Sequence, residues 1–143
     1  MRAFAALTLV LGAPAVAAPS PEAESVVDAF HSALAKGDTG AAAALLADDA
    51  LIFEEGGAER SKAEYAAHHL PADAAFSQAV RSTTVRRSSD FVDGLAWVAS
   101  EGRMKGAWKG KAVDRVTIET MVLRKTDEGW RIVHVHWSSA AAN

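Results

Sequence analysis

The chain has 143 residues, a formal net charge of −3 and no cysteine. A mildly acidic chain lacks the basic surface by which proteins bind nucleic acids, so we expect no nucleic-acid partner. Because disulfides are excluded, core packing and, we expect, oligomerisation must stabilise the fold.

The N-terminus has the order of a secretory signal peptide. Arg2 supplies a short basic region, residues 3–11 form an apolar run too short to span a bilayer, and Ala17 completes a small-residue cleavage motif. We expect three segments along the chain: a signal peptide over residues 1–17, a linker over 18–21 and one domain over 22–140. The mature protein would then be periplasmic or secreted, and outside the membrane because no second apolar run has transmembrane length.

Three helices are predicted at the start of the domain. The first has one apolar face at helical spacing, formed by Val26, Val27, Phe30 and Leu34. Gly37 ends this helix, and a second, alanine-rich helix follows to about residue 46. A capping box, Ser61-x-x-Glu64, begins the third helix, which the Leu70-Pro71 pair ends.

Beyond residue 79 the hydrophobic period changes from that of a helix to that of a strand. Four long strands are predicted after a short one at 51–53, over residues 79–88, 95–105, 113–125 and 130–138. Helices followed by a meander of long strands predict an α+β fold, in which a curved antiparallel sheet cups the three N-terminal helices.

Alternation along the last strand predicts which side chains face the helices. Val133, Val135 and Trp137 should face inward, because this set is the more uniformly apolar. The opposite set is too apolar for an ordinary solvated face, so we expect it to be covered by a second copy of the chain. The predicted homodimer interface contains Ile132, His134 and His136.

The same two histidines allow a metal site as an alternative. Alternate residues of a strand point the same way, and imidazoles are good zinc ligands. His68-His69 could add a third ligand, but the helix that carries this pair should lie on the other side of the sheet. We therefore predict no metal site and no cofactor, and expect His31 to be an ordinary surface residue.

Two segments carry a family resemblance. Val26–Glu55 followed by Ser61–Tyr65 resembles the nuclear transport factor 2-like, SnoaL-like superfamily, with a Gly-Asp turn between two helices and a short strand that ends in an acid. Glu119–Ser139 is similar to the branch that includes the association domain of calcium/calmodulin-dependent kinase II and exported bacterial proteins. The resemblance covers the mature chain and implies the cystatin-like superfold, a cone-shaped sheet around the helices.

That superfold hosts isomerases, dehydratases, cyclases and non-catalytic assembly modules, so the resemblance implies a fold more than an activity. It places Glu54 where steroid-isomerase-like members hold their carboxylate base. Phe30 replaces their oxyanion-hole tyrosine and Val122 or a neighbour replaces their protonated aspartate, which argues against steroid isomerisation. The arginines in the pocket of the kinase association domain correspond to Glu101, Met121 and Trp137.

We predict a pocket for a small organic ligand between the helices and the sheet, with Glu54 as candidate base. A carboxyl group at a strand end beside a Gly-Gly turn can be held over a cavity, where burial would raise its pKa and suit it to acid–base catalysis. The expected lining is aromatic and acidic, and consists of Tyr65, His69, Trp97, Glu101, Glu119, Met121, Val135 and Trp137.

Two functions remain open from the sequence. The protein could be a cofactor-free isomerase, dehydratase or hydrolase, or a non-catalytic dimerisation and interaction module. Against catalysis, Glu54 could be an exposed turn acid, and Glu101 and Glu119 could pair with arginines at the sheet rim.

Overall fold

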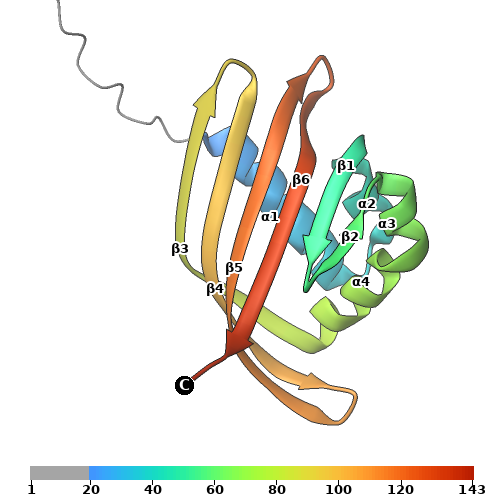
Figure 1. Cartoon of the computed structure of the whole chain (residues 1–143), viewed down its shortest axis with the longest axis vertical. Helices are drawn as coiled ribbons and strands as arrows, with labels where there is room; N and C mark the ends of the chain where they lie inside the picture. The colour runs from blue at the N-terminus through green and yellow to red at the C-terminus, as the bar shows by residue number, and fades with distance from the viewer. Residues whose placement is uncertain (1–19) are drawn as a thin grey trace, which may run out of the picture.

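The computed structural model describes residues 20–143, so the predicted signal peptide and the first linker residues lie outside the described part of the chain (Figure 1). Helices come before most of the strands, which confirms the α+β prediction. The elements in chain order are α1 (Pro21–Lys36), α2 (Thr39–Ala44), β1 (Leu46–Glu54), β2 (Gly57–Glu59), α3 (Lys62–His68), α4 (Leu70–Ala79), β3 (Val80–Val92), β4 (Leu95–Trp108), β5 (Lys111–Thr126) and β6 (Gly129–Ala141).

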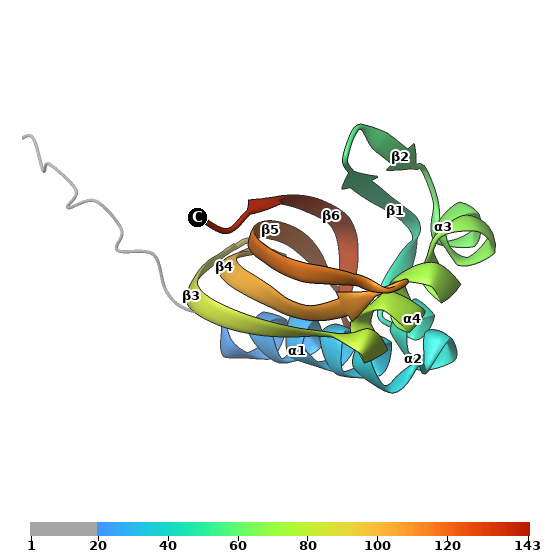
Figure 2. The same cartoon turned by 90° about the horizontal axis from the view of Figure 1, so that it is seen from below.

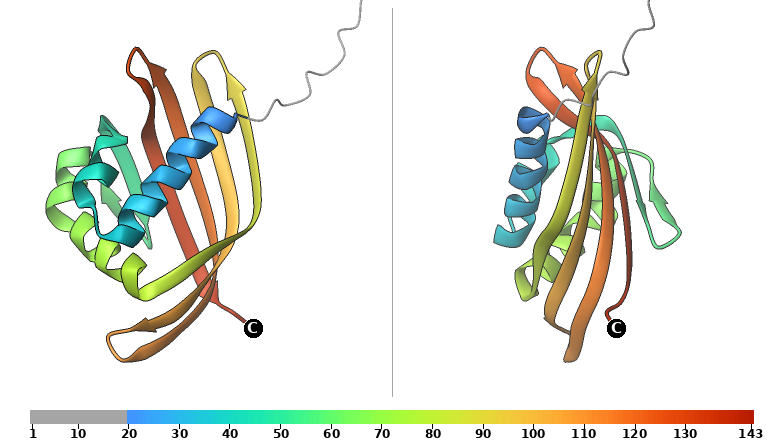
Figure 3. Two further views of the ribbon diagram at one scale, coloured as in Figure 1. Left: turned by 180° about the vertical axis from the view of Figure 1, so that it is seen from behind. Right: turned by 90° about the vertical axis from the view of Figure 1, so that its left-hand side faces the viewer.

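The helix α1 lies across one face of the sheet, as the left view of Figure 3 shows. Pro21 lies in its first turn, where a missing amide hydrogen costs nothing, and Gly37 ends it in the left-handed conformation with φ of 74°. Val27, Phe30 and Leu34 are buried. Burial of these side chains removes apolar surface from water and fixes α1 as one wall of the interior.

A fourth helix, α4, follows α3 almost without a break, so the prediction of three helices was wrong. Pro71 stands in the first turn of α4 rather than after the end of a helix. Proline is tolerated in that turn because the first amides of a helix have no intrahelical partner. None of the helices in residues 20–143 is long and apolar enough to cross a membrane.

The six strands form one curved sheet in the order β2-β1-β6-β5-β4-β3, which does not close (Figure 2). The four C-terminal strands pair antiparallel as predicted, whereas β1 lies parallel to β6. This parallel pairing brings the end of β1 beside the second half of β6, with Glu54 opposite Trp137.

A β-bulge at Val133 changes which side chains of β6 face inward. Leu123 of β5 pairs with Ile132, but the preceding residue Val122 pairs with His134, so that Val133 is left without a partner. Ile132 is therefore fully buried in the core, and its predicted place in a dimer interface was wrong. Beyond the bulge the prediction is correct, because Val135 is buried and His136 is exposed.

Candidate functional site

A cavity of about 640 Å³ opens between α1, α4 and the inner face of the sheet. A volume of this size suits a small organic molecule. Its walls are partly apolar and partly acidic, and the side chains that bear on chemistry are His31, Glu54, Asp73, Phe76, Met104, Lys105, Glu119 and Trp137.

One wall of the cavity holds a buried carboxylate with two donors. Glu119 of β5 is only 7% exposed. The indole Nε1 of Trp137 donates to its Oε2 at 2.6 Å, and Nε2 of His31 lies 2.7 Å from the same oxygen. The ring of Trp137 stacks on Phe30 with centroids 6.3 Å apart, which fixes the indole.

The environment of Glu119 keeps it ionised. Burial alone would raise the pKa of this carboxyl group, but the hydrogen bonds and charge of His31 and the bond from Trp137 outweigh burial and hold the pKa below its usual value. In return, the carboxylate orients the imidazole of His31, which is 40% exposed and lines the cavity.

Other carboxyl groups of the cavity have the reverse tendency: Glu54 of β1, which pairs with Trp137 on the side away from Glu119, and Asp73 of α4. Glu54 is an exposed residue, but partial desolvation of its carboxyl group raises the pKa of Glu54, and the nearby Asp73 raises it further. Burial also raises the pKa of Asp73, although Tyr65 donates its hydroxyl hydrogen to Asp73 Oδ2 at 2.8 Å. Burial and the charge of Asp73 push the pKa of Tyr65 far above its ordinary value, so this phenol stays a neutral donor.

The carboxyl groups on the two sides of Trp137 therefore differ in proton affinity. Glu119 prefers to be ionised, whereas Glu54 and Asp73 hold protons more readily than free carboxyl groups do. In many enzymes, different environments give the carboxyl groups of one site different pKa values. One group then acts as the acid and another as the base.

A second, much smaller cavity of about 50 Å³ lies behind Glu54. It is lined by Ile52, Glu54, Tyr65, His69 and the three residues of β2, Gly57, Ala58 and Glu59. Tyr65 and His69, predicted in the main pocket, therefore lie behind it, and Glu54 touches both spaces.

Three of the predicted pocket residues meet in the main cavity: Glu54, Glu119 and Trp137. Met121 and Val135 face the same side of the sheet but are fully buried in the core, so their predicted place in the pocket lining was wrong. They form the core beneath the cavity and are not among the residues that line it.

Trp97 and Glu101 lie on the outer face of the sheet, and their predicted place in the pocket was also wrong. In β4 the inward residues are Ala96 and Val98, while Trp97 is 41% exposed. The pairing shows why, because Glu119 is opposite Ser100 and Glu101 is opposite Ile118. An alignment displaced by one residue moves a whole strand to the other face.

Two site residues were not predicted, His31 and Asp73. His31 shares the cavity with Leu34, three positions further along α1, and this helical spacing was a usable signal. Asp73 lies in the first turn of α4, a helix that the sequence analysis missed.

The ionised state of Glu119 leads to a prediction for stability. A carboxyl group with a lowered pKa in the folded state stabilises the protein above its unfolded pKa, and this contribution is lost as pH falls through the folded value. Glu119→Gln should therefore lower the free energy of unfolding by about 1–3 kcal/mol near neutral pH. The difference should begin to shrink as the pH falls below the ordinary pKa of 4.5 and should vanish only below the lowered pKa of the folded state.

Urea denaturation at several pH values measures this difference. Glu101→Gln, on the outer face of the same sheet, is the matched control and should change stability little at any pH. A deficit of Glu119→Gln that stays constant down to strongly acidic pH would contradict the assignment.

Solved structures similar to this chain share its fold. A candidate ketosteroid isomerase from Shewanella frigidimarina is 39% identical over 82% of this chain and 94% of that one, with a TM-score of 0.79. A candidate calcium/calmodulin-dependent protein kinase II association domain from Xanthomonas campestris is 21% identical over 91% and 98%, with a TM-score of 0.70. A candidate dehydratase of the NTF2-like family from Streptomyces avermitilis is 18% identical over 85% and 95%, with a TM-score of 0.69.

No curated protein matched the chain. The model of the SnoaL-like domain matches residues 23–142, which is nearly the whole described chain. The predicted resemblance is thereby confirmed: this chain belongs to the SnoaL-like family, within the NTF2-like fold.

Proposed function

We propose that this protein binds a small organic molecule in the main cavity and transfers a proton on it without a cofactor, with Glu54 as the base. The observation that carries the proposal is that one cavity holds an ionised Glu119 in contact with His31 and, across Trp137, Glu54 near Asp73. This cavity is of ligand size.

The chemistry follows from the positions of these groups. In its ionised form Glu54 can accept a proton from a carbon acid or a bound water, and its raised pKa makes it a stronger base. The imidazole of His31, held by Glu119, can donate a proton at a second position of the ligand. If the proton returns at a second position of the ligand, the reaction is an isomerisation. If the ligand loses water, it is a dehydration, and if Glu54 activates a water, it is a hydrolysis.

The relatedness to a candidate ketosteroid isomerase supports this class of reaction. It does not extend to steroids, because Phe30 is a buried core residue where an oxyanion-hole tyrosine would be needed. The carboxyl groups and the apolar side chains of Phe76 and Met104 favour a ligand with both apolar and polar parts.

Proton abstraction can be tested with 5-nitrobenzisoxazole, which a base in an apolar pocket converts to a coloured phenolate. The wild-type protein should accelerate this reaction above the rate in buffer. Glu54→Gln should lower kcat/KM by about 100-fold or more, the usual contribution of a positioned general base.

Glu101→Gln serves as the control, since it removes a glutamate from the opposite face of the sheet and should leave the rate unchanged. Equal rates for Glu54→Gln and the wild type would rule out Glu54 as the base. A wild-type rate no higher than that in buffer would favour the non-catalytic alternative.

That alternative, a dimerisation or interaction module, is favoured by the outer face of the sheet. One row of paired residues runs across four strands, formed by Leu51, His134, Val122 and Trp97. Val116 and Ile118 extend this exposed apolar surface. Single exposed hydrophobic residues are ordinary, whereas a contiguous apolar patch indicates an interface. We propose that a second copy of the chain covers this face, with His134 and His136 inside the homodimer interface.

Trp97→Asp should disrupt this homodimer. A charge placed in a buried apolar contact should weaken association by at least about 2 kcal/mol, so the variant should sediment as a monomer at micromolar concentration. Val85→Asp, on an exposed position of the edge strand β3, should remain dimeric. A wild-type protein that is monomeric under these conditions would exclude the interface.

We also propose export, on the basis of the signal-peptide order in residues 1–17. The protein recovered from the periplasm or the medium should begin at Ala18, and its intact mass should lack the first 17 residues. Recovery of the full-length chain from the cytosol alone would contradict this proposal.

A further inference from the structure

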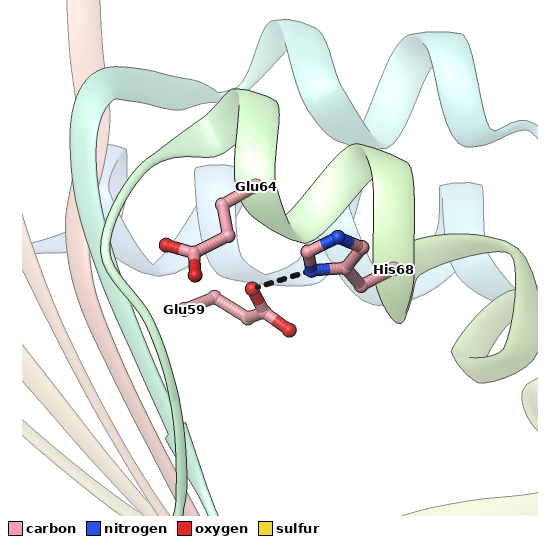
Figure 4. A group of neighbouring side chains, drawn as sticks. All are labelled: Glu59, Glu64 and His68. Atoms are coloured by element: carbon pink, nitrogen blue, oxygen red, sulfur yellow. Dashed lines mark hydrogen bonds and ion pairs between the residues drawn. The ribbon is translucent and has the colours of Figure 1, made fainter.

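A cluster of carboxylates and imidazoles lies outside the main cavity, between the end of β2 and α3 (Figure 4). Glu59 is the last residue of β2, and Glu64 and His68 lie one turn apart on α3. Residues four positions apart on a helix share a face, so both side chains of α3 reach the space in front of Glu59. Figure 4 shows the three groups pointing toward one another.

The distances in this cluster are close to those of a metal site. One ligand atom from each of Glu59, Glu64 and His68 lies within 4.8 Å of the other two. Nδ1 of His68 is 3.4 Å from Glu59 Oε2. Ligand atoms on a tetrahedral zinc ion lie about 3.4 Å apart, given bonds of about 2.0–2.2 Å. An ion would take the place of the hydrogen between His68 and Glu59, and the carboxylate of Glu64 would have to approach it from within 4.8 Å.

The burial of Glu59 is an independent reason to expect a cation here. Its side chain is 8% exposed, and buried carboxylates are almost always paired with a cation. Within residues 20–143 its partners are the imidazoles of His68 and His69, with no arginine or lysine. The neighbouring Arg60 contacts Ala58 and Glu64 instead.

The groups are held in place before any ion arrives. Ser61 accepts a hydrogen bond from the amide of Glu64 at 3.0 Å, and Glu64 Oε2 accepts one from the amide of Arg60 at 2.6 Å. These two bonds resemble a capping box, although Glu64 accepts from the amide before the N-cap residue Ser61, and they hold the carboxylate of Glu64 at the start of α3. His69 contacts the other oxygen of Glu59 and so orients the carboxylate from behind.

We propose that Glu59, Glu64 and His68 bind a divalent transition-metal ion of the zinc class. A mixed set of carboxylate oxygens and an imidazole nitrogen suits zinc or cobalt better than calcium or magnesium, which prefer oxygen ligands alone. The exposed side of His68 leaves a fourth position for water. The site lies apart from the main cavity and does not depend on the proposed acid–base function.

The His134-x-His136 pair that the sequence singled out is a poorer candidate. It lies on the outer face, and Nδ1 of His134 already contacts the carbonyl oxygen of Leu51 at 3.1 Å. Among the described residues, the group of Glu59, Glu64 and His68 is the one that brings three ligand atoms together. Metal binding by variants of the proposed site can therefore be compared directly with metal binding by a variant of His134 and His136.

The experiment uses tag-free protein stripped with a chelator and titrated with Zn²⁺ by calorimetry and with Co²⁺ by absorption. The wild type should bind one ion per chain, and Co²⁺ should show the intense visible bands of a tetrahedral site. His68→Gln and Glu59→Gln should each weaken Zn²⁺ binding at least about tenfold, since even loss of an outer hydrogen-bond partner costs that much. His134→Gln/His136→Gln should bind as the wild type does.

Failure of the wild type to bind one equivalent of Zn²⁺ would overturn the proposal. So would unchanged binding by His68→Gln, or binding lost only in His134→Gln/His136→Gln. His68 is mostly exposed, so its substitution leaves the fold intact even if Glu59→Gln, checked by circular dichroism, does not fold.

Discussion

The site depends on the bulge at Val133, which decides which side chains point to the interior in each half of β6. Before the bulge Ile132 closes the core, and after it Trp137 turns its indole toward Glu119. In a regular strand Ile132 and Trp137, five residues apart, would lie on opposite faces, and the core and the cavity could not both be built. One unpaired residue thus lets a single strand serve the core at one end and the site at the other.

The electrostatics of the cavity follow from where the strands and helices place their hydrogen-bond donors. Glu119 receives donors from α1 and β6, so a largely buried carboxyl group remains ionised. Among residues 20–143 no side chain donates a hydrogen bond to Glu54 at the end of β1, and partial desolvation together with Asp73 raises its pKa instead, although the residue is exposed. Chemically equal side chains acquire different proton affinities because their neighbours differ, which is how one fold can supply both an acid and a base.

The sequence predicted those parts of the structure that depend on local pattern. Glu54 was found because a strand that ends in an acid before two glycines is visible in a few residues. Glu119 was found because its alternation with Met121 holds along an unbroken strand. Glu101 was misplaced because the face of the sheet that a side chain occupies depends on the pairing between strands. A register shift of one residue moves the side chain to the other face.

The remaining errors have the same physical origin. Ile132 was misplaced because the bulge has no signature in the local sequence and is fixed by the pairing with β5. Asp73 was missed because Pro71 fits both the end of one helix and the first turn of the next. In both cases the deciding contact is tertiary, so a local pattern could not distinguish the alternatives.

The β1–β2 hairpin connects the proposed base with the proposed metal site. Glu54 stands at one side of its turn and Glu59 at the end of the returning strand, where it pairs with Ile52. The short strand β2 lies at the edge of the sheet and is paired on one side only. An ion held between Glu59 and α3 would tie this edge to the helices and, through the hairpin, would restrict the movement of Glu54. Because Glu54 also borders the small cavity next to Glu59 and His69, a charge added there would lower its pKa as well. A metal at Glu59 would therefore make Glu54 better positioned but less basic, and these opposing effects would set whether the ion assists or restrains proton transfer.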